Sequence, residues 1–216
     1  MSKIVKVDKV KEKLKDNLRI MFGGFLECGT PDKLIDLLHE EDIKDITLIA
    51  NDTGFPKKKL GSLVVEKRVK KVIASHVGTN PETGNQMNNE EIDVELVPQG
   101  TLAERIRSYG AGLGGILTPT GVGTVVEEGK EKKTIDGKEY ILEEALGADI
   151  ALVKAWKADE AGNLVFRYSA RNFNPLIAMA ADLVIVEAEE IVPTGAIDAN
   201  EVMTPGVFVD HIVDFD

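Results

Sequence analysis

The stretch Asp16–Pro31, DNLRIMFGGFLECGTP, contains the pattern that decides the fold. An apolar run ends at Phe22 and is followed directly by two glycines, and a second break follows at Gly29–Pro31. Glycine is costly in backbone entropy, so its use here indicates a tight turn or the close approach of another group. The pattern predicts a buried strand over Arg19–Phe25, then a turn, then a helix.

The helix predicted after this turn begins near Pro31. Thr30 is in a position to cap it, and Pro31 stands where a missing N–H costs nothing. Asp32 suits the positive end of the helix dipole. Apolar residues at helical spacing follow, namely Leu34, Ile35, Leu37 and Leu38.

Short runs rich in β-branched residues, each bounded by turn signals, predict further strands. The predicted strands lie at 45–50, 71–75, 92–97, 148–156, 163–168 and 182–186; helices are predicted over 5–18, 101–109 and 175–181, and a polar loop over 80–89. The dipeptide Asp136-Gly137 predicts a hairpin turn. Strands that alternate with helices predict an α/β fold with an open, largely parallel sheet covered by helices on both faces. We expect residues 1–216 to form a single domain.

Charge and composition exclude several classes of partner. The chain has 26 Lys+Arg against 37 Asp+Glu, a formal net charge of -11, which repels a nucleic-acid backbone. The most apolar stretch, residues 175–188, is interrupted by Asp182 and is shorter than the roughly 18 apolar residues of a membrane span. A single cysteine, Cys28, suits a reducing compartment. We therefore expect a cytoplasmic protein that binds neither nucleic acid nor membrane.

Two glycine-rich segments look like nucleotide motifs but lack the required context. Gly110–Gly115 has G-x-G-x-x-G spacing, yet it follows a predicted helix instead of a strand, which disfavours a dinucleotide site. Gly123–Lys130 has its glycines one position too far apart for a phosphate loop, and Glu131 stands where Ser or Thr is required. No metal is expected, because no Cys or His pair has ligand spacing and the three histidines are far apart: His39, His76 and His211.

Open parallel sheets bind ligands at the carboxyl ends of their strands. The turn at Gly23–Gly29 has that position, and so do the polar residues that begin with Asn51. Backbone N–H groups of the turn and of the following helix would form a site for an anion or a carbonyl group. Glycines used for packing alone are an equally good explanation. Cys28, in the same turn, is better explained as a small apolar filler than as a reactive thiol, because no base is placed beside it.

The stretch Asp16–Pro31 resembles the first signature of the class I coenzyme A transferases. That signature reads D/N-G/N, two free positions, three apolar residues, G-G-F, three free positions and G-x-P, and every fixed position is met. Further blocks resemble the alpha subunits of the bacterial acetate/butyrate–acetoacetate CoA-transferases, so the resemblance covers nearly the whole chain. These blocks are LIANDTGF, VIASHVGTNPETG, VPQGTLAERIR, GAGLGGILTPTGVGT, GNLVFRYSARNFNP and TPGVFVDHIV.

The resemblance implies transfer of CoA from an acyl-CoA to a short-chain carboxylate such as acetate, butyrate or acetoacetate. Such enzymes work by a ping-pong mechanism, through an acyl anhydride and a glutamyl-CoA thioester. In the family the glutamate belongs to the beta subunit, in a Ser-Glu-Asn-Gly turn, and that tetrapeptide is absent from this sequence. The resemblance therefore implies that the chain is inactive alone and pairs, across a large interface, with a beta subunit.

The resemblance also implies roles for particular residues. Gln99 would be catalytic, since its amide can donate a hydrogen bond to an oxygen that gains charge during acyl transfer. The negative charge of Glu27 disfavours phosphate contact at the turn and favours contact with the neutral pantetheine arm. The implied CoA contacts are Gly23, Gly24, Phe25, Leu26, Glu27, Cys28 and Gly29. The resemblance places Gly112, Gly114 and Gly115 at the acyl pocket or the subunit interface, and the position of Asn51 at the end of a predicted strand assigns it to the same substrate pocket.

Three alternatives remain open from the sequence. A succinyl-CoA:3-oxoacid CoA-transferase alpha subunit would need a basic residue facing a second carboxylate, and none can be placed. A non-catalytic sensor of acyl-CoA or of a sugar phosphate could use the same type of sheet. A self-sufficient thioesterase is disfavoured, because the sequence places no nucleophile beside a base.

Overall fold

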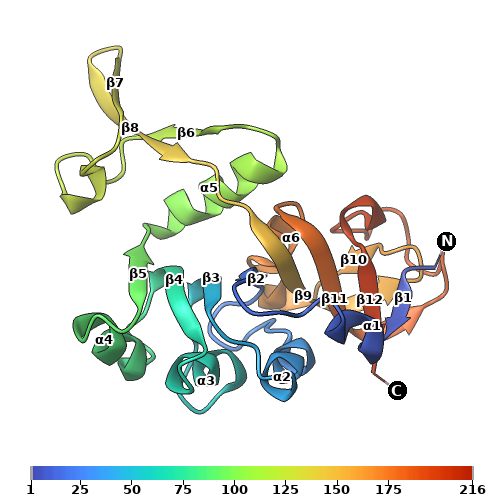
Figure 1. The fold of residues 1–216 in the computed structure, drawn as a ribbon. Coiled ribbons are helices and arrows are strands. Elements are labelled where there is room, and N and C mark those ends of the chain that lie inside the picture. Colours follow the sequence, from blue (N-terminus) through green and yellow to red (C-terminus); the bar gives the residue numbers. More distant parts are fainter. Residues whose placement is uncertain (1, 216) are drawn as a thin grey trace.

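The computed structural model describes residues 2–215, and its centre is a nine-stranded sheet (Figure 1). Eight strands follow the order β1-β12-β11-β9-β2-β3-β4-β5 with every pair parallel, and β10 pairs with β9 in the antiparallel sense. The predicted open, largely parallel sheet is confirmed. The strands are β1 Ile4–Lys6, β2 Arg19–Phe22, β3 Ile46–Asp52, β4 Val69–His76, β5 Asp93–Leu96, β9 Ala148–Asp159, β10 Leu164–Val165, β11 Ala181–Val192 and β12 His211–Asp214.

Helices cover both faces of this sheet, as the sequence predicts. One face packs against α1 (Val7–Lys11), α2 (Asp32–Glu40), α3 (Lys59–Val65) and α4 (Pro81–Asn88), and the other against α5 (Gln99–Gly110) and α6 (Asn174–Ile177) (Figure 1). Each face has its own buried apolar cluster, so β2, β3 and β9 lie between two hydrophobic layers. Burial on both faces explains why these strands are continuously apolar. Among the described residues, no helix is long and apolar enough to cross a membrane.

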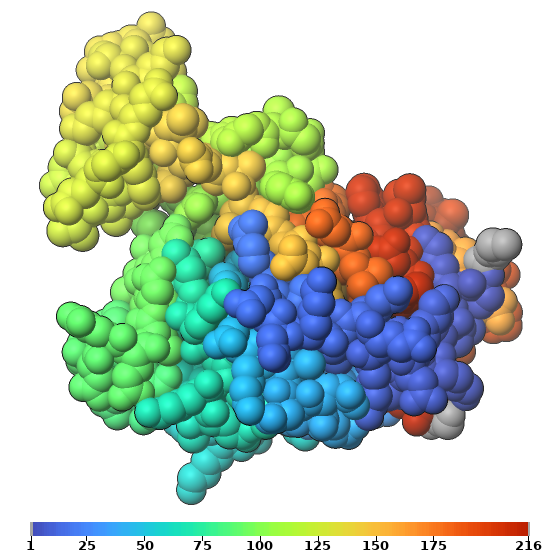
Figure 2. Space-filling model, viewed as in Figure 1, coloured from blue at the N-terminus to red at the C-terminus, as the bar shows by residue number. Residues whose placement is uncertain are grey.

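A second, three-stranded antiparallel sheet stands away from the main body (Figures 1 and 2). It consists of β6 (Gly115–Thr118), β7 (Lys132–Ile135) and β8 (Lys138–Glu144) in the order β6-β8-β7, and we call it the arm. The hairpin predicted at Asp136-Gly137 is confirmed, with positive φ angles of 49° and 78° that suit a type I′ turn. The loop between β6 and β7 exposes 79% of Val125.

The predicted helix over 5–18 is wrong. The segment forms β1 and only the short helix α1. Ile4 and Val5 pair in parallel with Ile212 and Val213 at the edge of the sheet. That pairing joins residues from opposite ends of the sequence, so local periodicity cannot reveal it.

The predicted strand over 163–168 is confirmed only at β10. The chain turns at Tyr168, whose φ of 50° leaves the strand region, and a 3₁₀ helix, η2, covers Tyr168–Arg171. This turn leaves the Tyr168 side chain 85% exposed.

The polar segment 80–89, predicted as a loop, contains helix α4. Pro81 stands at its first position, where no N–H is needed. Thr83 and Gln86 are buried, and the Gln86 amide donates a 2.8 Å hydrogen bond to the carbonyl oxygen of Val64. Buried polar contacts therefore hold this helix, which has no apolar stripe that the sequence could show.

Gly84→Ala is expected to stabilise the protein by about 0.5–1 kcal/mol. Gly84 lies inside α4, and a Cβ built there meets no atom within 4 Å, so only the entropic penalty of glycine is removed. The free energy of unfolding from urea titrations measures the effect. Gly61→Ala is the contrasting variant, because its Cβ would lie 2.1 Å from the Phe55 carbonyl oxygen, and it should destabilise. A destabilising Gly84→Ala would contradict the helix.

Candidate functional site

The carboxyl ends of β2, β3, β4 and β5 meet at one edge of the sheet. Gly23 follows β2, its N–H donating to the Leu152 carbonyl oxygen of β9 at 3.0 Å. Asn51 lies near the end of β3, and its backbone and side-chain oxygens accept from the Ser75 hydroxyl of β4 at 2.8 and 3.2 Å. Gln99 begins α5, just after β5. The structure therefore places the turn, Asn51 and Gln99 along the same edge.

The turn after β2 is a tight hairpin. The backbones of Phe25 and Cys28 exchange two hydrogen bonds of 3.1 and 3.0 Å, which leaves Leu26 and Glu27 as the loop. Leu26 has a φ of 56°, an uncommon conformation for a residue with a side chain. The hairpin projects Phe25 from the sheet edge, with 43% of the residue exposed.

The buried carboxylate of Asp52 holds the tip of this hairpin. Its Oδ2 accepts from the Leu26 N–H at 2.7 Å and from the Asn51 amide at 2.9 Å, and its Oδ1 accepts from the Gly54 N–H at 2.8 Å. Asp52 is only 2% exposed, and hydrogen bonds compensate for burying its charge. These bonds fix Leu26 in its unusual conformation. The sequence analysis selected Asn51 at this position, but the residue that holds the turn is Asp52.

Asn172 closes the hairpin from the opposite side. Its side-chain oxygen accepts from the Gly24 N–H at 3.1 Å, and its amide donates to the Cys28 carbonyl oxygen at 2.9 Å. A Cβ on Gly24, whose φ is 118°, would lie 2.6 Å from the Thr30 hydroxyl. Both the backbone conformation and the space therefore require glycine at this position.

Asn174 joins the turn to the central strand β9. Its amide donates to the Gly29 carbonyl oxygen at 2.9 Å, and its oxygen accepts from the Lys154 N–H at 2.8 Å. A Cβ on Gly23 would lie 1.8 Å from that oxygen, so glycine is needed to admit the asparagine. The sequence could have suggested this residue only through the NFNP segment, which is unusually polar next to a helix.

The start of α2 is capped by a carboxylate from β11. Glu187 is 2% exposed, and its Oε2 accepts from the N–H groups of Lys33 and Leu34 at 2.7 and 3.2 Å. Its Oε1 forms an ion pair with Lys154 at 2.8 Å. The prediction that Thr30 caps this helix is wrong, because its hydroxyl donates instead to the Leu26 carbonyl oxygen.

The anion site predicted at this turn therefore has fewer free donors than the sequence suggests. The N–H groups of Gly24 and Leu26 in the turn, and those of Lys33 and Leu34 in the helix, already donate to side-chain oxygens of this chain. A substrate anion would have to displace them.

Gln99 is exposed at the first position of α5, and its side-chain amide makes no hydrogen bond to another residue within 2–215. Its donor is therefore available to a ligand at the sheet edge. Asn51 differs, because it is 2% exposed and its amide is taken up by Asp52. Asn51 is therefore not available to a ligand, and its contact is the hydrogen bond that it donates to Asp52.

Gly112, Gly114 and Gly115 lie at the other edge of the sheet, which corrects their grouping with Asn51 in one pocket of this chain. These glycines lie beside the segment that ends at Gly147, just before β9, because the Ala145 N–H donates to the Gly114 carbonyl oxygen. Gly23 lies beside residue 153 of β9. The six residues between 147 and 153 span about 20 Å along the strand. A Cβ built on Gly112 or Gly114 meets no atom within 4 Å, so these glycines face open space.

Cys28 is exposed, which does not fit its interpretation as a small apolar filler. Its sulfur lies 3.2 Å from the Ser169 hydroxyl of η2, which shows that the turn and η2 are direct neighbours. Across residues 2–215, no group of three or more His, Cys, Asp and Glu side chains is placed to hold a metal ion.

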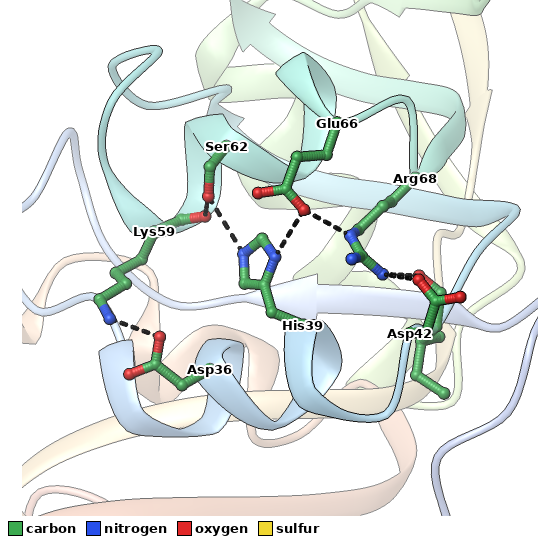
Figure 3. A network of polar contacts seen from close by, with 8 residues as sticks. Asp36, His39, Asp42, Lys59, Ser62, Glu66 and Arg68 are labelled. Atoms are coloured by element: carbon green, nitrogen blue, oxygen red, sulfur yellow. Dashed lines mark hydrogen bonds and ion pairs between the residues drawn. The ribbon is translucent and has the colours of Figure 1, made fainter.

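A cleft of about 470 Å³ lies between the turn, α2 and α3. His39 lines it, with Nε2 3.1 Å from the Ser62 hydroxyl and Nδ1 3.0 Å from Glu66 (Figure 3). These distances resemble a hydrolytic triad, but the Ser62 hydroxyl also lies 2.8 Å from the Lys59 carbonyl oxygen of its own helix, and Glu66 is shared with Arg68 at 2.7 Å. The network ties α2 to α3 and gives the thioesterase alternative no support.

A larger cleft of about 820 Å³ lies beside η2. We call it the η2 cleft; it is lined by Trp156, Arg167, Tyr168, Arg171, Glu201 and Met203, among others. Leu26 and Glu27 of the hairpin line the smaller of these two clefts, whereas no hairpin residue lines the η2 cleft.

Comparison with known proteins assigns the family. The sequence profile described as coenzyme A transferase matches residues 6–214. The chain belongs to the coenzyme A transferase family. The alpha subunit of the acetate CoA-transferase of Escherichia coli is 57% identical over 199 residues, which cover 92% of this chain and 90% of that protein.

Other members of the family match over almost the whole chain. The acetoacetyl-CoA:acetate/butyrate CoA transferase alpha subunit of Clostridium acetobutylicum is 51% identical over 98% of this chain and 97% of its own length. One subunit of the succinyl-CoA:3-ketoacid coenzyme A transferase of Helicobacter pylori is 50% identical over 98% of this chain and 92% of its own length. The resemblance to alpha subunits is confirmed.

Solved structures confirm the fold. An acyl-CoA transferase apoenzyme from Escherichia coli superposes with a TM-score of 0.87 at 21% identity, covering 100% of this chain and 47% of that chain. The glutaconate coenzyme A-transferase of Acidaminococcus fermentans gives a TM-score of 0.82 at 20% identity, covering 98% and 75%. The chain thus spans about half of the first of these proteins.

Asn174→Ala is expected to destabilise the coenzyme A transferase chain by roughly 3 kcal/mol. The substitution leaves the Lys154 N–H and the Gly29 carbonyl oxygen without the partners that they have in the structure. Urea unfolding measures the loss, with the exposed Asn200→Ala as the matched control. Equal stability of the two variants would show that Asn174 does not hold the turn.

Asp32→Asn is expected to stabilise the chain at pH 7. Burial raises the pKa of the Asp32 carboxyl above 3.8, and the charge of Glu187 raises it further. The folded state therefore binds this proton more tightly than the unfolded state, and wild-type stability falls as pH rises through the raised pKa. The difference in free energy of unfolding between Asp32→Asn and the wild type should therefore become smaller as the pH is lowered towards 3.8. Unfolding at several pH values measures this difference, with the exposed Asp182→Asn as the control variant.

Proposed function

We propose that the chain is the alpha subunit of an enzyme that moves CoA from an acyl-CoA to a short-chain carboxylate such as acetate, butyrate or acetoacetate. The observation that carries this proposal is the 57% and 51% identity to acetate and acetoacetyl-CoA:acetate/butyrate transferase alpha subunits over nearly their whole lengths. The exposed Gln99 and the pre-formed hairpin, both at one sheet edge, are consistent with it.

The reaction proceeds by attack of a carboxylate on a thioester. A beta-subunit glutamate attacks the acyl-CoA carbonyl, so that an anhydride forms and CoA leaves as a thiolate. The thiolate attacks the glutamyl carbonyl, which gives the enzyme thioester and releases the first carboxylate. The acceptor carboxylate then repeats the two steps in reverse, and the new acyl-CoA leaves with the glutamate regenerated.

This chain contributes positioning and electrostatic stabilisation. The hairpin Gly23–Gly29 presents Phe25 and Leu26 to the neutral pantetheine arm, while Asp52 and Asn172 keep its shape. The Gln99 amide donates to the carbonyl oxygen that becomes negative in each tetrahedral step. No side chain of this turn is required as a nucleophile.

The arm and the glycines before it contact the beta subunit in this proposal. Gly112 and Gly114 are exposed far from the hairpin, and Leu113 and Leu117 beside them are exposed apolar residues. Exposed apolar side chains on a projecting element are typical of an interface with another chain. Of the two roles expected for these glycines, the interface is the one that the geometry favours.

A succinyl-CoA:3-ketoacid transferase is the second candidate, because the Helicobacter pylori relative with that name is 50% identical. The two candidates differ in the acceptor. Measuring kcat/KM for acetate, butyrate and succinate with the same acetoacetyl-CoA donor separates them, and a preference for succinate would overturn the first proposal.

Activity is expected only when the chain is mixed with a glutamate-bearing beta subunit. The assay follows CoA transfer from acetoacetyl-CoA to acetate or butyrate, with each chain alone as control. Gln99→Ala in the complex should lower kcat by about 10²- to 10³-fold, since it removes one donor to the developing oxyanion. Asn85→Ala, an exposed amide in α4, should have no effect. Transfer by the chain alone, or CoA binding without transfer, would contradict the proposal.

A further inference from the structure

The arm does not share an apolar core with the main body. Both buried apolar clusters of the body consist of residues outside 115–144, and the buried Ile141 of the arm belongs to neither of them. Two short segments, 111–114 and 145–147, connect the arm to the body, and each contains glycine (Figure 1). Without a shared core, the direction of the arm depends on the backbone and polar contacts at this joint.

One side chain, that of Arg105 on α5, connects the arm to the body. Its Nε donates to the Glu144 carbonyl oxygen of β8 at 2.8 Å, and its Nη1 lies 2.6 Å from the Glu95 carboxylate of β5. The same Nη1 is 3.9 Å from the Glu143 carboxylate, which also belongs to the arm. A planar guanidinium holds several acceptors in fixed directions, so Arg105 couples α5 and the sheet edge to the root of the arm. We call Arg105, Glu95 and Glu143 the arm clamp.

The arm clamp is largely shielded from water. The Arg105 side chain is 11% exposed and the Glu143 side chain is 2% exposed. The other oxygen of Glu143 pairs at 2.6 Å with Lys130, which precedes β7. Carboxylates and cations therefore alternate from Glu95 on the body to Lys130 on the arm. Ion pairs in such surroundings are screened little by salt, and removal of one member leaves a buried charge without its partner.

The joint has space on one side. A cleft of about 430 Å³ lies between β5, α5 and the arm, and Arg105 and Glu143 line it. Gly112 has a φ of 72°, and a Cβ built on Gly112 or Gly114 meets no atom within 4 Å. Glycines in open space allow backbone rotations that other residues resist. The glycines therefore allow the arm to rotate, and the arm clamp opposes that rotation.

We propose that Arg105 is a positioning residue, which holds the arm in the orientation that the beta subunit binds. The inference rests on the proposed function, in which the arm contacts that subunit. An arm that is already oriented binds without the entropic cost of being ordered on contact, so the arm clamp raises the affinity between the two chains. Helix α5 begins at Gln99 and ends at the joint, so one element relates the arm to the Gln99 amide.

The orientation of the arm is measured on the full chain without the beta subunit. Spin labels at Lys133→Cys in β7 and Asn88→Cys in α4, in a Cys28→Ser background, report the distance between arm and body in pulsed EPR spectroscopy. The chain with Arg105 should give one narrow distance distribution, and Arg105→Gln should lose it. An unchanged distribution in Arg105→Gln would overturn the proposal.

Two further variants accompany this measurement. Arg107→Gln is the matched control and should keep the narrow distribution, because Arg107 is exposed on the same helix and pairs with Glu104 at 2.6 Å within that helix. Glu95→Gln serves if Arg105→Gln fails to fold. The Glu95 side chain is 36% exposed, so its substitution removes the body end of the arm clamp without burying a lone charge, and it should also broaden the distribution.

Sedimentation velocity with a beta subunit measures the effect on assembly. Arg105→Gln should associate about tenfold more weakly than the wild type, since charge-assisted hydrogen bonds that orient the arm are lost. At saturating beta subunit its kcat should equal that of the wild type, because the partner then holds the arm.

The possible failures are distinguishable. If the wild-type chain binds no beta subunit, the proposed function fails while the EPR distances still decide the arm clamp. Equal association of wild type and Arg105→Gln, with a broadened distance distribution, would show that the orientation of the arm does not control assembly. A lower kcat of Arg105→Gln at saturating beta subunit would assign the residue to the placement of Gln99. Either of these last two results would overturn the proposal.

Discussion

The hydrogen bonds that three polar side chains make to the hairpin at Gly23–Gly29 are the constraint on which the candidate site depends. Asp52 from β3, and Asn172 and Asn174 from the segment before β11, together accept from or donate to backbone groups on both sides of the turn. A hairpin with a left-handed Leu26 would not persist by itself, since such a backbone costs free energy unless its surroundings compensate. The parallel sheet brings these three side chains to one place.

Side chains of the protein also occupy several of the N–H groups that could have held an anion at this turn. A helix N-terminus and a run of glycines usually leave N–H groups free for an anion. Here Glu187 occupies the start of α2 and is balanced by Lys154, so the helix end is neutralised within the protein. Positive charge without a carboxylate partner is found instead at η2. The site thus separates a rigid hairpin, in which the charge of Glu27 is paired with Lys58, from the positively charged lining of the η2 cleft.

Part of this arrangement could be predicted from the sequence. The continuous apolar strands, the hairpin at Asp136-Gly137 and the helix after Pro31 follow from local propensity and turn chemistry, and each is confirmed. Helix α4 could not be predicted, because buried hydrogen bonds such as that from Gln86 to the Val64 carbonyl oxygen replace an apolar stripe. Strand β1 could not be predicted either, since its partner is near the other end of the chain.

The sequence by itself determined the family, the parallel α/β architecture and the importance of the Gly23–Gly29 turn, because these depend on residue types at short, fixed spacings. Only the tertiary structure decided which groups are available to a ligand. It buried Asn51 behind the site, exposed Cys28 and Gln99, and moved Gly112 to the opposite edge of the sheet. Exposure and hydrogen-bond partners depend on which strands become neighbours, and residues far apart in the chain determine that.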